Sequence, residues 1–250
     1  MSLALLIAGK ETRELVTSIR GLAWLVTLSV MLSLFSALLV SNTELSLLDN
    51  AQVVYMMMGT ITALGALLAI VLGSDSIAGE RERGSLIPLL LAPLSGFELV
   101  LGKIGGQVMA WAVTYALALP YLWAVGSSGQ NLVQAVGYLA LFGTPVVLGF
   151  GFAAIGLSAR FGSVRGALIS SLIALIVLAS PLVLGTGLRQ SAIGKAFDAV
   201  NPFAAAVNSF DSAVIDSDPI GSQLARLAVA AIWLLLTAWF AKRSVERMEI

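Results

Sequence analysis

The 250-residue chain contains no cysteine and no histidine. These absences exclude disulfides, thiolate or imidazole metal sites, and every Cys-His or Ser-His nucleophilic arrangement. Charged residues make up only 11% of the chain, less than half of the roughly 25% common in soluble domains. The formal net charge is zero, so the charge balance indicates neither nucleic acid nor another polyanion as a partner.

Hydrophobic residues are abundant instead, at 58% of the chain, which is more than one aqueous core of this length can hide. The sequence therefore predicts an all-α polytopic membrane protein, with residues 1–250 forming a single transmembrane domain. Each predicted span has about the 20 apolar residues that a helix needs to cross the bilayer, where a lone segment must satisfy its own hydrogen bonds. The six predicted spans are about 22–41, 53–73, 104–125, 132–157, 166–188 and 223–241.

Lysine and arginine fall mostly on one side of these spans. With the N-terminus inside, eleven of them are cytoplasmic and three lie outside, a strong inside bias. Counting 86–101 as a seventh span would change the tally to eight against six, and that run is short and contains Pro88, Pro93 and Glu98. We therefore expect a plasma (inner) membrane protein with both termini in the cytoplasm, and we expect 86–101 to be a broken helix at the headgroups.

Residues 1–21 form an amphipathic lead-in to the first span. Apolar residues recur there at helical spacing beside Lys10, Glu11, Arg13 and Glu14, a pattern too charged to cross a membrane. We expect this helix to lie along the inner leaflet. Whether it does more than anchor the chain is left open by the pattern.

The longest outer loop, residues 189–222, carries a helical apolar stripe that Pro202 interrupts. Asn201 as N-cap and Pro202 at the first helical position resolve the conflict by starting a second short helix. Neither helix is long enough to cross. The loop therefore predicts an outer re-entrant or interfacial hairpin before the last span.

No motif for catalysis is found. The predicted spans hold essentially no ionisable residue away from their ends, whereas intramembrane enzymes and ion-coupled transporters need such groups.

The side chains of Met56–Met58 point in three directions on a helix, which favours core packing over a copper site. Gly79 and Gly84 have the spacing of phosphate-loop glycines, but Ser85 and Leu86 replace the required Lys and Ser/Thr. We expect no enzyme activity, no metal and no cofactor in this chain, and its substrate-binding residues cannot be read from the sequence.

The cytoplasmic segment 74–102, between the second and third predicted spans, is a charged island in this apolar chain. It holds alternating charges at one membrane face, where a soluble partner protein would be able to bind them. A resemblance to a known family, carried by the same segment, implies that the residues of this contact are Gly79, Glu80, Arg81, Glu82, Arg83, Gly84, Ser85 and Leu86. Since the chain has no nucleotide motif of its own, energy for active transport would have to enter from a second protein here.

This segment resembles the membrane subunits of ATP-binding-cassette transporters of the type 2 class. The resemblance is to short six-span permeases similar to the nitrous-oxide-reductase maturation and gliding-motility subunits. Their pattern is Glu-Arg-Glu-x-Gly-Thr-Leu, then Leu-Leu, Pro, Ser-Arg and Leu-Gly-Lys at the third span. Here it reads Glu80-Arg81-Glu82-Arg83-Gly84-Ser85-Leu86, Leu89-Leu90, Pro93, Ser95-Gly96 and Leu101-Gly102-Lys103.

Ile87-Pro88 replaces the usual acidic residue and Gly96 the usual Arg, so the chain lacks those two side chains. The lead-in and the Asn201-Pro202 pair also look like those of such permeases.

The resemblance implies a coupling helix at about residues 76–86 that docks in a groove of a separate cytosolic ATPase, which binds ATP and Mg. Both charge signs would fix its register, Leu86 would supply an apolar plug, and Gly79 and Gly84 would end the helix. It further implies a homodimer with two ATPase copies, acting as an exporter, and it leaves room for a periplasmic or extracellular accessory protein. Two alternatives stay open: a stand-alone secondary transporter or channel, and a membrane scaffold that recruits a cytosolic partner.

Overall fold

The computed structural model of the chain describes residues 3–41, 50–86, 95–126, 132–180, 191–215 and 219–248, and no strand occurs within these ranges. The all-α class expected from the composition is confirmed for this part of the chain. In order, the elements are α1 (Leu3–Thr17), α2 (Ile19–Ser41), α3 (Asn50–Asp75), α4 (Ala78–Glu82), α6 (Gly96–Gly126), α7 (Leu132–Tyr138), the π-helix η2 (Leu139–Gly143), α8 (Thr144–Arg160), α9 (Val164–Ala179), α11 (Ala192–Val200), α12 (Pro202–Val214), the 3₁₀-helix η4 (Ile220–Gln223) and α13 (Leu224–Glu246).

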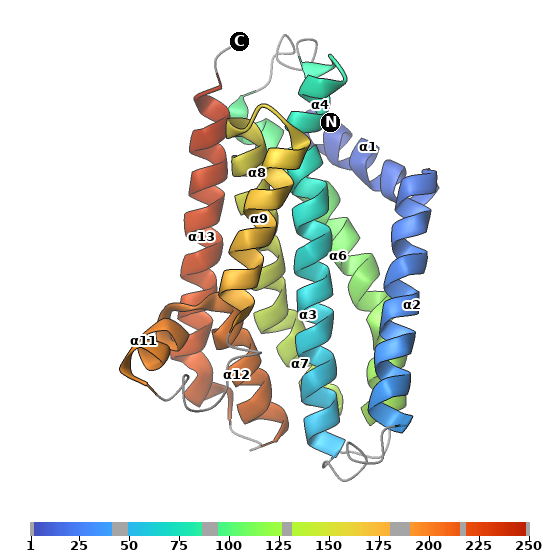
Figure 1. Ribbon diagram of the computed structural model, residues 1–250, viewed down its shortest axis with the longest axis vertical. Coiled ribbons are helices and arrows are strands. Elements are labelled where there is room, and N and C mark those ends of the chain that lie inside the picture. Colours follow the sequence, from blue (N-terminus) through green and yellow to red (C-terminus); the bar gives the residue numbers. More distant parts are fainter. Residues whose placement is uncertain are drawn as a thin grey trace.

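The long helices run side by side along one axis (Figure 1). Helix α4, the start of α1 and the end of α13 lie at one end of this bundle, and α11 lies toward the other. The charged segment and both chain ends therefore share one end of the molecule. Which side of a membrane that end faces stays a prediction.

In the part of the chain that the structure describes, five helices are long and apolar enough to cross a membrane. They cover Gly21–Leu39, Val53–Glu82, Gly96–Val125, Leu132–Arg160 and Leu224–Glu246. These lengths and compositions support a polytopic membrane protein. The predicted span 166–188 coincides with α9, an apolar helix of 16 residues, and residues 181–188 lie outside the described part of the chain. The count of six spans therefore stays a prediction.

Helix α6 begins earlier than the sequence predicted. The expected start was residue 104, but the helix begins at Gly96, directly after Ser95. The Ser95 hydroxyl accepts from the Glu98 backbone N–H, and the Glu98 carboxylate accepts from the Ser95 backbone N–H, a capping box that fixes this start. Residues 96–102 are thus the first turns of α6, and the prolines expected to break a helix over 86–101 are Pro88 and Pro93. Residues 87–94 lie outside the described part.

The fourth predicted span is divided by a π-helical turn. The π-helix η2 lies between α7 and α8, and Pro145 is the second residue of α8. Proline has no N–H to donate and crowds the carbonyl four residues before it, so a regular α-helix cannot pass this point unchanged. The π-helical turn accommodates this proline within the predicted span.

Two glycines of α3 pack inside the molecule. A Cβ built on Gly65 would lie 2.4 Å from the ring of Trp111 in α6, and one on Gly73 would lie 2.7 Å from the Cβ of Ala154 in α8. These side chains can approach only because the glycines have none. These two glycines therefore pack against helices of the same chain.

The hairpin before the last helix consists of two helices with different surroundings. The Asn201 side chain accepts from the backbone N–H groups of Phe203 and Ala204, so Asn201 is the N-cap of α12 with Pro202 at its first position, as the pair predicts. Phe203 and Phe210 are fully buried in the main core, whereas α11 has no buried residue. Helix α12 is thus part of the core, and only α11 has the exposed surface expected of an interfacial helix.

The packing of α3 on α8 predicts opposite effects for two glycine substitutions in one helix. Gly73→Ala would place its Cβ 2.9 Å from the Gly151 carbonyl oxygen, so we expect it to destabilise the protein by roughly 1–3 kcal/mol. Gly59→Ala is the matched control, because no atom lies within 4 Å of its added Cβ and alanine is the better helix former, by up to about 1 kcal/mol. Unfolding followed in detergent micelles measures both, and equal effects would contradict the close contact.

Candidate functional site

The candidate site is the end of α3 and the turn that follows it, residues 74–86, which we call the elbow. The short helix in it, α4, has five residues and is shorter than the coupling helix expected at 76–86. Gly84 follows the C-cap residue of α4 with a φ of 73°, a backbone angle that glycine adopts without strain. Gly79 has another role than ending the helix, since a Cβ there would lie 2.2 Å from a carboxylate oxygen of Asp75.

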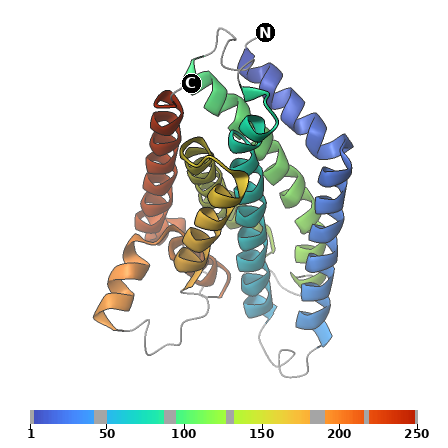
Figure 2. The ribbon, with the colours of Figure 1, turned by 45° about the horizontal axis from the view of Figure 1, so that its top comes forward.

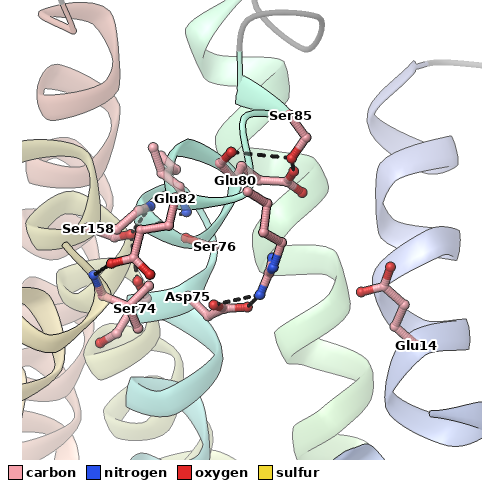
Figure 3. A network of polar contacts seen from close by, with 12 residues as sticks. Glu14, Ser74, Asp75, Ser76, Glu80, Glu82, Ser85 and Ser158 are labelled. Carbon is pink, nitrogen blue, oxygen red and sulfur yellow. Dashed lines mark hydrogen bonds and ion pairs between the residues drawn. The ribbon is translucent and has the colours of Figure 1, made fainter. Parts of the chain in front are cut away.

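The first turn of α4 is bonded to α8 through a single hydroxyl. The Oγ of Ser158 accepts from the backbone N–H of Ala78 at 2.8 Å and from that of Ile77 at 3.2 Å, and it donates to the Ser74 carbonyl at 2.8 Å. Figure 3 shows Ser158 and Ser74 meeting there. Backbone N–H groups at a helix start have no partner within the helix, so this buried hydroxyl satisfies them. The elbow is therefore fixed to α8 and α3 at its base.

Four charged side chains join the elbow to α1 and α6, and we call them the charge network: Lys10, Glu11, Glu80 and Lys103. The ammonium of Lys103 is 2.6 Å from a Glu11 carboxylate oxygen and 3.3 Å from a Glu80 oxygen, and its side chain is only 4% exposed. Lys10 lies 3.3 Å from the same Glu80 oxygen. Two ammonium groups at this distance favour the ionised form of Glu80, which also accepts from the hydroxyl of Ser85.

The charge on Lys10 is also secured by its neighbours. Partial burial alone would lower the pKa of Lys10, but the carboxylates of Glu80 and Glu14 outweigh that effect and hold the pKa above its usual value. The ammonium therefore persists at every physiological pH. Lys10, on α1, is thus a permanent cation facing the elbow.

The remaining charges of the elbow are also bonded within the chain. Arg83 contacts both carboxylate oxygens of Asp75, at 2.6 and 2.8 Å. Glu82 accepts from the backbone N–H of Val164 at 2.9 Å, and Arg81 donates to the Phe161 carbonyl at 3.0 Å. These last two bonds reach the start of α9 and the turn before it. The elbow consequently touches α1, α3, α6, α8 and α9.

Burial divides the eight residues assigned to partner contact into two sets. Glu82, Arg83 and Gly84 are exposed, and Arg81 and Ser85 are partly exposed. Gly79, Glu80 and Leu86 are buried, and Leu86 packs in a cluster of its own chain with Ile77 and Leu99. Leu86 therefore does not project as the apolar plug that the resemblance implied. The role of the exposed set in binding a partner stays a prediction.

The sequence reasoning missed the partners inside the chain. Helix α1 packs against α6 because Gly105 and Gly106 leave room for it, with a Cβ on Gly106 only 2.4 Å from that of Glu11. Figure 2 shows α1 running beside the first turns of α6 before it bends into α2. In the sequence, the glycine pair at 105 and 106 directly after Lys103 is the feature that would have indicated a helix packed against this part of α6. Lead-in residues 3–17 thus do more than anchor the chain.

Hydrogen bonds and ion pairs join the elbow to the neighbouring helices. Within the described ranges, no group of three or more acidic residues could hold a metal ion. Met57 and Met58 are fully buried in the core, while Met56 is exposed, so the three thioethers do not converge.

A family model described as ABC-2 family transporter protein matches residues 5–250. A comparison with curated proteins finds none that matches the chain.

The charge network predicts a large cost for removing its buried cation. Lys103→Ala would leave the carboxylates of Glu11 and Glu80 without their buried partner, so we expect a loss of about 3–5 kcal/mol. The control is Lys242→Ala, since the Lys242–Glu246 pair is about half exposed and is worth less than about 1 kcal/mol. Unfolding in micelles compares the two variants, and a Lys103 effect as small as the Lys242 effect would contradict the network.

Proposed function

Because the chain belongs to the ABC-2 transporter family, we propose that it moves a solute with energy from ATP hydrolysed by a separate subunit, received through the elbow. Family membership and the apolar helices make the chain a multi-pass membrane permease subunit of an ABC transporter. Membership also implies an ABC ATPase as its partner. Coupling through the elbow and the direction of transport are the proposed parts.

The observation that carries the proposal is that one surface of the elbow is exposed while the other is bonded to helices of the same chain. Its outer surface, Glu82, Arg83 and Gly84, is exposed and bears both charge signs, which suits docking in a fixed register. Its inner surface is bonded to several helices through Glu80 and through the hydroxyl of Ser158. A force on the outer surface would therefore displace packed helices together and would not be absorbed by a flexible loop.

We propose that two copies of the chain act with two ATPase copies, and that the solute path follows the interface between the permeases. Six predicted spans are half the number that exporters of this kind use, which favours a homodimer. Closing of the ATPase pair would push both elbows and rotate the attached helices as rigid bodies. By resemblance, we assign the direction as export.

Docking through the exposed set predicts a charge effect at Glu82. Glu82→Gln keeps an acceptor for the Val164 N–H, whereas Glu82→Lys reverses the charge, so we expect the first to weaken and the second to abolish co-purification of the ATPase. Lys195→Glu, an exposed position on α11 at the other end of the bundle, is the control. Co-expression with the ATPase and affinity purification give the measurement.

Unchanged complex formation by Glu82→Lys would contradict docking at this surface. Uphill solute flux by the chain reconstituted alone would favour the secondary-transporter alternative. A complex that neither transports nor alters ATP hydrolysis would favour the scaffold alternative.

Mechanical linkage predicts a different phenotype for Ser158. Ser158→Ala removes the acceptor of two backbone N–H groups but leaves the exposed surface unchanged, so we expect normal ATPase binding with altered ATP turnover. Turnover per complex, measured beside the amount co-purified, separates the two effects. Loss of binding in proportion to turnover would show that Ser158 serves folding rather than transmission.

A further inference from the structure

A cavity of about 780 Å³ lies beside the elbow, between the α1–α2 bend and helices α3, α6 and α9. This volume is within the roughly 300–1,000 Å³ typical of ligand sites. Ile19, at the bend, lines the cavity and is 81% exposed, so the cavity opens to the surface of the bundle. The cavity borders the outward face of the elbow to which we assign the ATPase, and Arg83 belongs to both.

One end of the cavity is charged. Lys10 and Arg83 lie there with side chains 56% and 48% exposed, beside the carboxylates of Glu14 and Asp75. Figure 3 shows Glu14 of α1 directed toward the elbow and Asp75. An ammonium has three N–H donors and a guanidinium five, so both cations keep donors after binding their carboxylates. This end therefore presents donors for a phosphate and acceptors for an ammonium.

The rest of the wall is largely apolar. Leu68, Leu72 and Trp24 line it, together with Leu168 of α9. Leu68 precedes Asp75 by seven residues on α3, which is about 10 Å along the helix axis. The lining thus changes from charged to apolar along the direction of the bundle, as a membrane does from headgroup to acyl chain.

We propose that this cavity binds a glycerophospholipid of the leaflet next to the elbow. Its phosphate contacts Lys10 and Arg83, its acyl chains lie along Leu68 and Leu72, and the opening at Ile19 lets them extend into the bilayer. The ordered change from charge to apolar wall favours such an amphipathic occupant over a helix of a second copy, which would bring an apolar side chain against the charged end. The proposal requires only that these helices lie in the membrane, and it does not depend on coupling to an ATPase.

The first test counts phospholipid that stays bound to the purified full-length chain, by native mass spectrometry in detergent. Two arms supply phosphatidylethanolamine or phosphatidylglycerol, because both contain the phosphate but only the first contains the ammonium. We expect about one retained lipid per chain, and at least tenfold lower retention for Leu72→Trp, which fills the cavity. Leu235→Trp, on the exposed face of α13, is the matched control. Equal retention by the two variants, or no retention by the native chain, would overturn the proposal.

The two cations and the occupant are tested separately. Lys10→Gln combined with Arg83→Gln should weaken retention of both lipids, and a stronger loss for phosphatidylglycerol would show that Glu14 and Asp75 hold the ammonium of the other lipid. A photo-crosslinking residue in place of Leu168 identifies the occupant of the cavity directly. This test remains valid if the Leu72→Trp variant does not fold. A phospholipid adduct at that position supports the proposal, and an adduct with a second copy of the chain refutes it.

Discussion

The buried ammonium of Lys103 is the group on which the end of the molecule near the elbow depends. It lies where α1, α4 and α6 meet, and it is shared by carboxylates from two of those helices. A cation with so little access to water is tolerable only while both carboxylates remain in place, because its desolvation would otherwise be uncompensated. The positions of α1 and of the elbow are thus linked energetically, and neither can leave α6 without exposing charge to an apolar environment.

The polar side chains near the elbow have a consistent role. The hydroxyl of Ser158 and the carboxylate of Glu82 accept from backbone N–H groups of the elbow and of α9. The long helices between are held by apolar packing and close glycine contacts, as at Gly73. A densely packed interior transmits displacement better than a loosely packed one. Polar bonding at one end and close packing along the axis together make a unit suited to moving as a whole.

Local features of this fold could be predicted from the sequence, and long-range pairings could not. The Asn201-Pro202 start of α12 is fixed by adjacent residues, so its pattern was sufficient. Hydropathy placed the start of α6 too late, because the helix continues past its apolar part to Ser95. The charges of the elbow were recognised, yet their partners were not, since Glu11 and Lys103 are 92 positions apart. No periodicity records such a contact, and only the Gly105-Gly106 pair hinted at a helix packed there.

The π-helical turn between α7 and α8 has a consequence for how the two halves of that span can turn. A π turn holds one residue more than an α turn, and each residue of an α-helix accounts for about 100° of rotation. Converting the turn to regular α-helix would thus twist α7 about its own axis by roughly that angle while α8 stayed bonded to the elbow. The π turn therefore sets the rotation of α7 relative to α8, the half of this span that Ser158 bonds to the elbow.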